Sequence, residues 1–406
     1  MPEHARNPAS DVAAPLVFLT LVATFLVSLG VAGLRWKELF PDFISFWAAG
    51  KNLASGRSPY DVQDQIDVQY AYGWDKETTG RGIYDFLPYY YPPWLGLVWV
   101  LFLPLGFAAA KLLWFFLNVE LTLVSGYLLR RAVPRAPPWM SVLLASLSFF
   151  TLACVLLGQT SILVLFLAVV SWRLLEAGWE RSAGVVLAWL TIKPQLTAVL
   201  LLALLLRLMQ QHRWTAVRWF FLTLAVLCLA STLLVPAWPL EMLRAPSQTP
   251  SPTKHYPWIG NVWFLVLRAV GLPEWLVWAL YLVVALPFLG VVVRTALRGA
   301  CSSLDLMGLS LLAAFFVAPY ARHYDFVVLL IPLLALLRDR LPPLVAILLV
   351  LALVVVPYVQ QSLLVQYKPL YSPSVSLFLE GTYFWVPTVL TIAWLASRRR
   401  SQGMRV

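Results

Sequence analysis

The stretch 304–337 reads LDLMGLSLLAAFFVAPYARHYDFVVLLIPLLALL. It sets two apolar segments, 304–320 and 325–337, on either side of a polar turn that contains Arg322, His323 and Tyr324. A long apolar run with very few charges is typical of a helix that lies in the hydrocarbon core of a bilayer. We therefore expect two adjacent membrane helices joined by a short polar connection.

The whole chain is rich in hydrophobic residues and poor in charged ones, as these two segments are. Hydrophobic residues make up 61% of its 406 residues, charged residues only 12%, and the mean hydropathy is +0.78. These values lie far outside the range of a soluble globular domain. We therefore predict an all-α polytopic membrane protein that forms a single domain over residues 1–406, with no soluble domain, repeat or linker.

Apolar segments recur along the chain and predict about 11 or 12 transmembrane helices. The segments 183–192 and 195–207 are each too short to cross alone, so they are expected to form a hairpin bent at Lys193. The stretch 92–104 is expected to be interfacial or re-entrant. The other spans are expected near 15–34, 107–129, 138–157, 160–177, 217–236, 274–294, 304–320, 325–337, 342–358 and 382–398.

Arginine-rich short loops predict the topology, because positive charge near membrane helices is retained in the cytoplasm. With the first helix running outward, every basic cluster falls on one side, and both termini are cytoplasmic. We expect a multi-pass protein of the plasma (inner) membrane whose polar segments 35–91, 237–262 and 359–381 lie on the non-cytoplasmic side. The first of these would carry interfacial helices, and the second a flap.

The net charge of +11 does not indicate a nucleic-acid partner, because the basic residues are scattered over many short loops. Cys154, Cys228 and Cys301 show no metal-ligand spacing and predict neither a disulfide nor a zinc site. We expect no cofactor.

Asp42 begins an apolar stretch, 43–56, that is predicted to form a short helix in the membrane interface. A carboxylate just outside the bilayer could accept the proton of a sugar hydroxyl as that oxygen attacks an activated anomeric carbon. The alternative is a helix N-cap, which aspartate favours and which needs no chemistry.

A second polar helix is expected to carry Asp61, Asp64 and Asp67 at a spacing of three, which places the three acids near one face. A divalent-metal site is conceivable there. A solvated face is the more common meaning of such a row, and we predict no bound metal.

Several polar residues next to the expected helices could contact a sugar or an acceptor: Tyr60, Tyr91, Gln159, Gln195 and Tyr324. Tyrosines such as Tyr91 also line bilayer interfaces without any further function. The glutamine at position 159 could instead belong to a plain turn between two spans.

Lys193 lies in an apolar hairpin, where a lysine costs about 2.5–3.5 kcal/mol unless it reaches the interface or finds an anion. A lipid phosphate is a suitable anion, and snorkelling to the interface is the alternative. Arg322 and His323 could neutralise the charge on a phosphate leaving group. Alternatively, Arg322 could simply pair with Asp325 to close the turn.

The order of these residues resembles that of glycosyltransferase family 87, a family of the GT-C superfamily. The matching features extend over about residues 40–335. They are Asp42, Gly56 with Pro59 and Tyr60, Tyr91-Pro92, Pro104-Leu105, Gly158-Gln159, Lys193-Pro194, and Pro319 followed by His323-Tyr324.

The resemblance implies a GT-C type fold, an acidic base in the first external loop and a polyprenyl-phosphate-linked sugar donor, commonly mannose. Transferred to this chain, the base is Asp42, and Lys193, Arg322 and His323 lie near the donor phosphate. We therefore predict an inverting hexosyltransferase that modifies a glycolipid or glycan acceptor and whose other partners are membrane lipids. The alternatives are a flippase for lipid-linked sugars and a ligase that uses a polyprenyl-pyrophosphate oligosaccharide.

Overall fold

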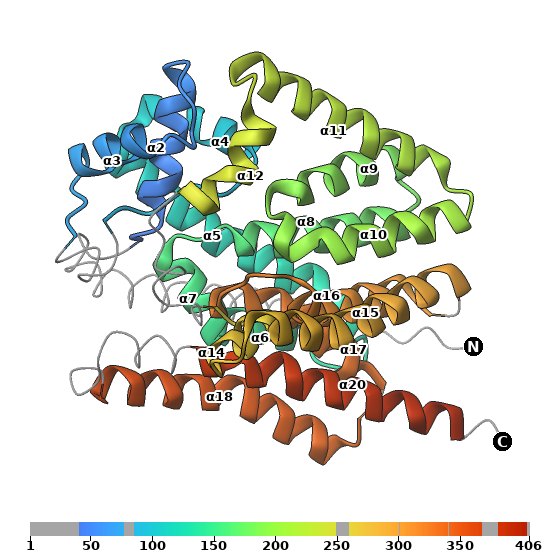
Figure 1. The fold of residues 1–406 in the computed structure, drawn as a ribbon. Helices are drawn as coiled ribbons and strands as arrows, with labels where there is room; N and C mark the ends of the chain where they lie inside the picture. The colour runs from blue at the N-terminus through green and yellow to red at the C-terminus, as the bar shows by residue number, and fades with distance from the viewer. Residues whose placement is uncertain are drawn as a thin grey trace, which may run out of the picture.

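The computed structural model describes residues 40–76, 85–248, 260–299, 301–339, 341–367 and 381–403. Every regular element within these ranges is a helix, which confirms the predicted all-α fold. Figure 1 shows that many of the helices run side by side in roughly one direction. The predicted first helix, 15–34, lies outside the described residues, as do parts of the predicted outer segments 237–262 and 359–381.

The inner layer consists of short helices that are apolar on all sides. Helix α16 (Ser303–Val317) is buried without interruption from Leu304 to Phe316, and it packs against α10 (Pro194–Gln210). A helix without a polar face has to be enclosed, either by protein or by lipid. The 3-10 helix η5 (His323–Leu329) and helix α17 (Leu330–Asp339) follow α16 and complete this layer.

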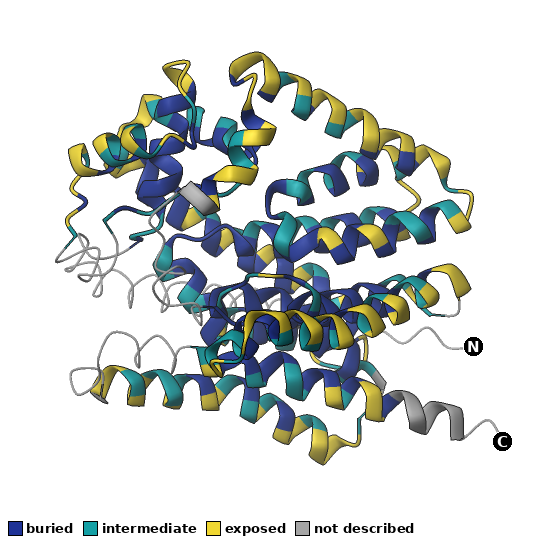
Figure 2. Cartoon of the chain, viewed as in Figure 1, coloured by how far each residue is buried: buried dark blue, intermediate teal, exposed yellow. Residues whose placement is uncertain are grey.

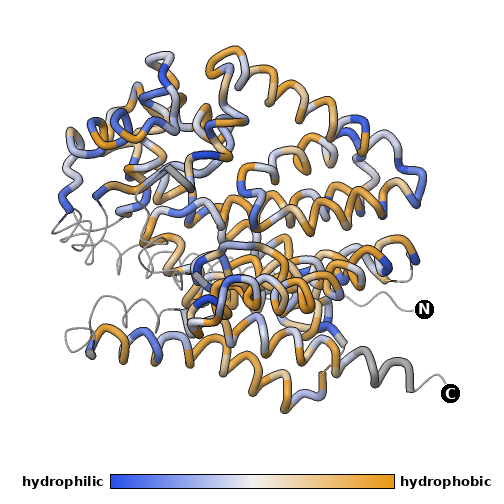
Figure 3. The backbone as a smooth tube through the Cα atoms, viewed as in Figure 1, coloured by the Kyte–Doolittle hydropathy of each residue, from blue (hydrophilic) through white to orange (hydrophobic). Residues whose placement is uncertain are grey.

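The longest helices include three on the outside of the molecule, α11, α15 and α18, and one, α5, that is half buried within it. Four of them in the described residues are long and apolar enough to cross a bilayer. Helices α11, α15 and α18 carry many exposed residues (Figure 2), and these helices are largely hydrophobic (Figure 3). Apolar surface on the outside is expected where lipid is the solvent. The four are α5 (Phe107–Leu129), α11 (Trp214–Leu234), α15 (Glu274–Arg298) and α18 (Pro343–Tyr367).

These helices confirm a polytopic membrane protein. The predicted number of 11 or 12 spans stays a prediction, since the described residues contain four membrane-length helices, or five with a bent pair. Several expected spans correspond to helices of 10–17 residues, such as α16 and the helical stretch Thr382–Ser397.

The expected span 138–157 is broken into α6 (Pro138–Leu147) and α7 (Phe149–Leu157), which meet at 56°. The rings of Phe149 and Phe150 at the start of α7 pack against His323 and Phe326 of η5. We attribute the bend to this packing, which directs α7 toward the inner layer.

The predicted hairpin is present. Helix α9 (Glu180–Trp189) continues into a short 3-10 turn, and α10 starts after Lys193 with Pro194 at its first position. Proline is well suited to this position, because the first N–H groups of a helix have no partner inside it. Helix α9 is covered by α11 and by α8 (Ser161–Glu176).

Both helices predicted in the first polar segment are present as α2 (Phe43–Ala54) and α3 (Val62–Ala71). Helix α2 is more enclosed than the interfacial helix that its apolar spacing predicts. It packs between α3 and α4 (Pro93–Val100), with the ring of Phe46 stacked on Trp99 at 5.3 Å. The predicted partial segment 92–104 corresponds to α4 and a following 3-10 turn.

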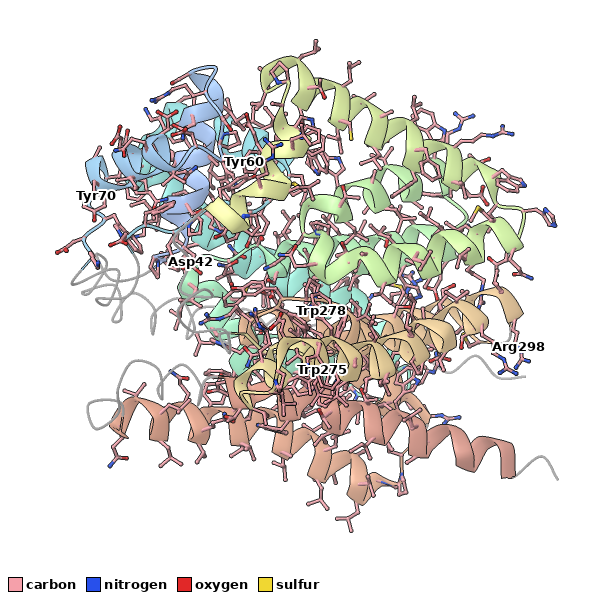
Figure 4. All side chains as sticks on the ribbon, in the orientation of Figure 1. Asp42, Tyr60, Tyr70, Trp275, Trp278 and Arg298 are labelled. Atoms are coloured by element: carbon pink, nitrogen blue, oxygen red, sulfur yellow. The ribbon has the colours of Figure 1, made fainter. Side chains whose placement is uncertain are left out.

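The molecule has two clearly different ends. Figure 4 shows Asp42 and Tyr70 at one end of the bundle and Arg298 at the other. Helix α12 (Trp238–Gln248) lies at the first end, where Trp238 contacts Trp94 of α4 edge to face at 5.4 Å. The described parts of the polar segments 35–91 and 237–248 thus lie at one end, and which side of a membrane this end faces stays a prediction. The remaining helices are α14 (Trp263–Ala269) and α20 (Trp385–Gly403).

Candidate functional site

The segment that carries Asp42 is anchored to the end of α7. The backbone N–H of Phe40 donates to the carbonyl of Leu156 at 2.9 Å, and that of Asp42 donates to the carbonyl of Leu157 at 3.1 Å. The last carbonyls of a helix have no partner within it. These two bonds therefore satisfy the end of α7 and fix the backbone of Asp42 beside it.

Gly158 makes this close approach possible. Its φ of +73° ends α7 in the left-handed region, which glycine adopts without strain. A Cβ atom here would lie 3.1 Å from the Cβ of Phe40 and 3.3 Å from that of Phe43. Its carbonyl accepts a hydrogen bond of 2.8 Å from the indole N–H of Trp114. The turn is thus held from α5 while the Asp42 segment packs against it.

The next residue, Gln159, contacts the Asp42 side chain directly. Its amide Nε2 donates to Oδ2 of Asp42, and its Oε1 accepts from the hydroxyl of Tyr91 at 3.3 Å. Gln159 is buried, whereas Asp42 is half-buried. The Asp42 side chain does not cap α2. The N-cap alternative is therefore not what the structure shows, and the carboxylate is turned toward Gln159 instead.

Lys193 forms a buried ion pair. Its Nζ lies 2.5 Å from Oδ1 of Asp325 and 2.8 Å from Oγ of Ser161, which itself donates to the same carboxylate oxygen at 2.5 Å. The side chains of Lys193 and Asp325 are each 1% exposed. In this structure the anion that a buried lysine requires is thus a carboxylate of the same chain.

The ion pair also orders the polar turn. The second oxygen of Asp325, Oδ2, accepts the backbone N–H of Arg322 at 2.8 Å. Removing one partner of a buried, hydrogen-bonded ion pair is strongly destabilising, because the other charge is then left without compensation. Lys193 therefore holds, through Asp325, the start of the helical turn that contains His323.

Tyr91 links these two networks. The Lys193 ammonium lies 5.7 Å from the ring centroid of Tyr91 and 5.0 Å from that of Tyr324, within the range of cation–π attraction. The Tyr91 hydroxyl reaches Gln159 on its other side. Together these residues form a polar cluster, which consists of Asp42, Tyr91, Gln159, Ser161, Lys193, Tyr324 and Asp325.

Arg322 and His323 lie next to the polar cluster. Arg322 is half-buried, and His323 is 9% exposed. The His323 ring stacks on Phe149 at 6.0 Å and tilts against Tyr383 at 5.3 Å. Both residues are neighbours of Asp325 in sequence and are held by the same turn.

Tyr60 and Gln195 are close to the cluster in different ways. The Tyr60 hydroxyl donates to the backbone carbonyl of Tyr91 at 2.8 Å. Burial raises the pKa of Tyr60 well above its usual value, so this hydroxyl stays protonated and remains a donor. Gln195 is half-buried in the first turn of α10, two residues after Lys193.

The three acids of α3 have separate partners. Asp61 caps the helix by accepting the N–H of Asp64 at 2.9 Å, Asp64 pairs with Arg57 at 2.6 Å, and Asp67 accepts from Gln63 at 2.7 Å. Within the part of the chain that the structure describes, no group of three or more histidine, cysteine, aspartate or glutamate residues could hold a metal ion.

Two contacts of the site have no clear signal in the sequence. Asp325 suggests a pairing with the nearby Arg322, but its side chain binds Lys193, 132 residues away. A lysine and a carboxylate at the ends of different apolar segments are a weak sign of such a pair. Nothing in the sequence predicts that the indole of Trp114 bonds the carbonyl of Gly158, because a tryptophan in an apolar helix normally indicates packing.

The chain matches a known protein family. The family model described as glycosyltransferase family 87 matches residues 89–321, more than half of the chain. The matched range contains Tyr91, Gln159 and Lys193, whereas Asp42 precedes it. No curated protein and no solved structure matches this chain.

Proposed function

We propose that this chain, which belongs to glycosyltransferase family 87, transfers a hexose from a polyprenyl-phosphate carrier to a glycolipid or glycan acceptor. The observation that carries this proposal is the polar cluster. It joins Asp42 to Gln159, Tyr91, Lys193 and Asp325 at one end of an apolar bundle. A half-buried carboxylate in such a place has an accessible face and fixed partners, as a general base requires.

The proposed reaction is a single displacement. Asp42 accepts the proton of the acceptor hydroxyl while that oxygen forms a bond to the anomeric carbon of the donor sugar. The bond between this carbon and the phosphate oxygen breaks, and the polyprenyl phosphate leaves with the electron pair. Because attack and departure take place on opposite faces, the anomeric configuration is inverted.

The phosphate is proposed to leave toward Arg322, His323 and Lys193. Arginine binds phosphate through several N–H groups at once, and Arg322 is half-buried rather than enclosed. Lys193 is fully enclosed and already paired with Asp325. Its proposed contribution therefore requires the phosphate to share this ion pair, whereas Arg322 and His323 can act from the edge of the cluster.

The sugar and the acceptor are proposed to contact Tyr60, Tyr91, Gln159, Gln195 and Tyr324, which lie around the polar cluster. The donor sugar is proposed to be mannose, by analogy with the family. The non-cytoplasmic side is proposed for the site, since the arginine-rich loops predict a cytoplasmic location for the opposite end.

The test is transfer of radiolabelled mannose from synthetic polyprenyl-phosphate mannose to membrane-extracted acceptors by the purified protein. In Asp42→Asn we expect transfer to fall by about 10²–10⁴-fold, the usual contribution of general acid–base catalysis. Asp67→Asn is the matched control, because it removes the same charge from the exposed face of α3 and should keep full activity.

Three results would contradict the proposal. Near-normal transfer by a folded Asp42→Asn protein would exclude the base role. Movement of labelled carrier lipid across proteoliposomes without a transfer product would indicate a flippase. Transfer from a pyrophosphate-linked oligosaccharide alone would indicate a ligase. The anomeric configuration of the product, measured by NMR, tests inversion separately.

A further inference from the structure

The amide of Gln159 lies between the hydroxyl of Tyr91 and the carboxylate of Asp42. Its Oε1 accepts from the Tyr91 hydroxyl, and its Nε2 donates to the Asp42 carboxylate. A carboxamide has one end that only accepts and one end that only donates, and an ionised carboxylate only accepts. The orientation of this amide therefore decides whether Asp42 faces a donor or a second acceptor.

The observed orientation favours the ionised carboxylate. If the amide were turned around, its oxygen would face Asp42, and the two oxygens would repel each other unless Asp42 carried a proton. In the observed orientation the hydroxyl, the amide and the carboxylate form a chain that ends on a charge. Hydrogen bonds to a charged group are stronger than neutral ones, and each bond in such a chain polarises the next.

The tyrosine hydroxyl is suited to the donor role. Burial raises the pKa of Tyr91, so the hydroxyl keeps its proton. The Tyr91 ring is fixed on two sides, by the Lys193 ammonium at 5.7 Å and by the ring of Phe46 at 5.4 Å. Its position relative to Gln159 is thus determined by packing as well as by the hydrogen bond.

Other charged and titratable groups belong to the elements around this site. Lys193 at the start of α10 and Asp325 of η5 have opposite charges 2.5 Å apart and largely offset each other. Lys111 of α5 lies over the Phe40 ring at 5.8 Å. The titratable hydroxyl groups nearby are those of Tyr91 and of Tyr324 in η5, and burial raises the pKa of both.

We propose that Gln159, which accepts a hydrogen bond from Tyr91, is a positioning residue that keeps Asp42 ionised and therefore able to accept a proton. This inference rests on the proposed role of Asp42 as the base, and it gives Gln159 and Tyr91 a task beyond contact with the sugar. Because the donor is a neutral amide, it stabilises the carboxylate without adding a positive charge, which would lower the basicity of Asp42 further.

The experiment is an infrared titration of the Asp42 carboxyl in the purified protein, in which the band of the protonated acid is assigned by subtracting the Asp42→Asn spectrum. Gln159→Leu removes the donor and should move the titration midpoint upward by about one pH unit, as expected for one hydrogen bond to a charged group. Tyr91→Phe should give a smaller shift in the same direction.

Tyr89→Phe is the matched control. It removes a hydroxyl from the same run of tyrosines, and that hydroxyl bonds the carbonyl of Pro92 rather than Gln159. This variant should leave the midpoint unchanged. In the transfer assay, Gln159→Leu should lower kcat more at pH 6 than at pH 8.5, with little change in KM for the donor.

An unchanged or lowered midpoint in Gln159→Leu would overturn the inference, as would a shift of equal size in Tyr89→Phe. The infrared readout needs no substrate, so it tests the positioning role even if this donor is the wrong one. Conversely, normal transfer by Asp42→Asn would refute the base role while the titration still reports on the Gln159 contact.

Discussion

Helix α10 has a buried cation at each of its ends, and the two are stabilised in different ways. Lys193 precedes the helix and is 1% exposed, and Arg207 lies in the last turn and is 3% exposed. The lysine forms an ion pair with one carboxylate, that of Asp325. The arginine donates to backbone carbonyls of another helix and of the loop that follows it.

Arg207 caps the end of α15. Its Nε donates to the carbonyl of Ala296 at 2.8 Å, and its two terminal nitrogens donate to the carbonyls of Thr295 and Cys301, each at 2.9 Å. The C-terminal end of a helix carries partial negative charge and carbonyls without partners, and the planar guanidinium can serve several of them at once.

The two ends of α10 therefore have different roles: the Arg207 end is structural, and the Lys193 end belongs to the proposed active site. Arg207 engages fixed backbone dipoles, and its charge has no partner that a substrate could replace. Lys193 instead pairs with a side chain that belongs to the same turn as Arg322 and His323, next to the proposed base. The lysine end therefore holds groups that a phosphate could engage, whereas the arginine end holds two helices together.

The largest effect is expected for Lys193→Met. It leaves the Asp325 carboxylate buried without its counter-charge, so we expect a loss of about 3–5 kcal/mol in stability and loss of transfer. Stability can be followed as thermal unfolding in detergent, with a thiol-reactive dye that reports exposure of the buried Cys154.

The double variant Lys193→Met with Asp325→Leu is the control for this prediction. Because no charge is then buried alone, we expect most of the stability to return, whereas transfer should stay low. Recovery of transfer in the double variant would show that the ion pair has only a structural role, and the contrast with Arg207 would disappear.

An intermediate effect is expected for Arg207→Met. It removes the donor to three carbonyls, and we expect a loss of about 2–3 kcal/mol in stability, in line with charged hydrogen bonds. The transfer rate per folded molecule should be unchanged, because the residue lies at the opposite end of α10 from the polar cluster. A lower kcat at full folding would contradict the division into two ends.

The smallest effect is expected for Ser161→Ala. The hydroxyl contacts both partners of the ion pair, but Lys193 and Asp325 still touch each other without it. We expect a loss of about 1 kcal/mol and a reduction of kcat of a few fold, measured in the same two assays. A loss as large as that in Lys193→Met would mean that the serine, rather than the ion pair, orders the turn.

The sequence predicted those parts of the fold that depend on segments taken one at a time. The span expected over 274–294 is α15, and the break expected at Lys193 is the start of α10. Both follow from local properties, namely the transfer of an apolar segment into lipid and the steric demands of proline. The bend at Ser148 was not predictable in this way, because it depends on packing against η5.

The candidate site was predictable in part. Asp42, Gln159 and Lys193 stand out because polar or charged side chains near apolar segments are costly and rare. Their residue types suggested a base, a hydrogen-bonding amide and a cation. Nothing in the sequence indicated that Gln159 would contact Asp42, or that Lys193 would pair with Asp325, since 117 and 132 residues separate the partners.

The sequence by itself determined that this chain is a helical membrane protein and that its unusual polar residues lie between apolar segments. Composition and the positions of the apolar segments are sufficient for this, because the free energy of transfer from water into lipid is a property of each segment by itself. Only the tertiary structure decided which polar groups meet. A hydrogen bond or ion pair depends on the relative position of two side chains to within a fraction of an ångström, and that position is set by the packing of all the helices together.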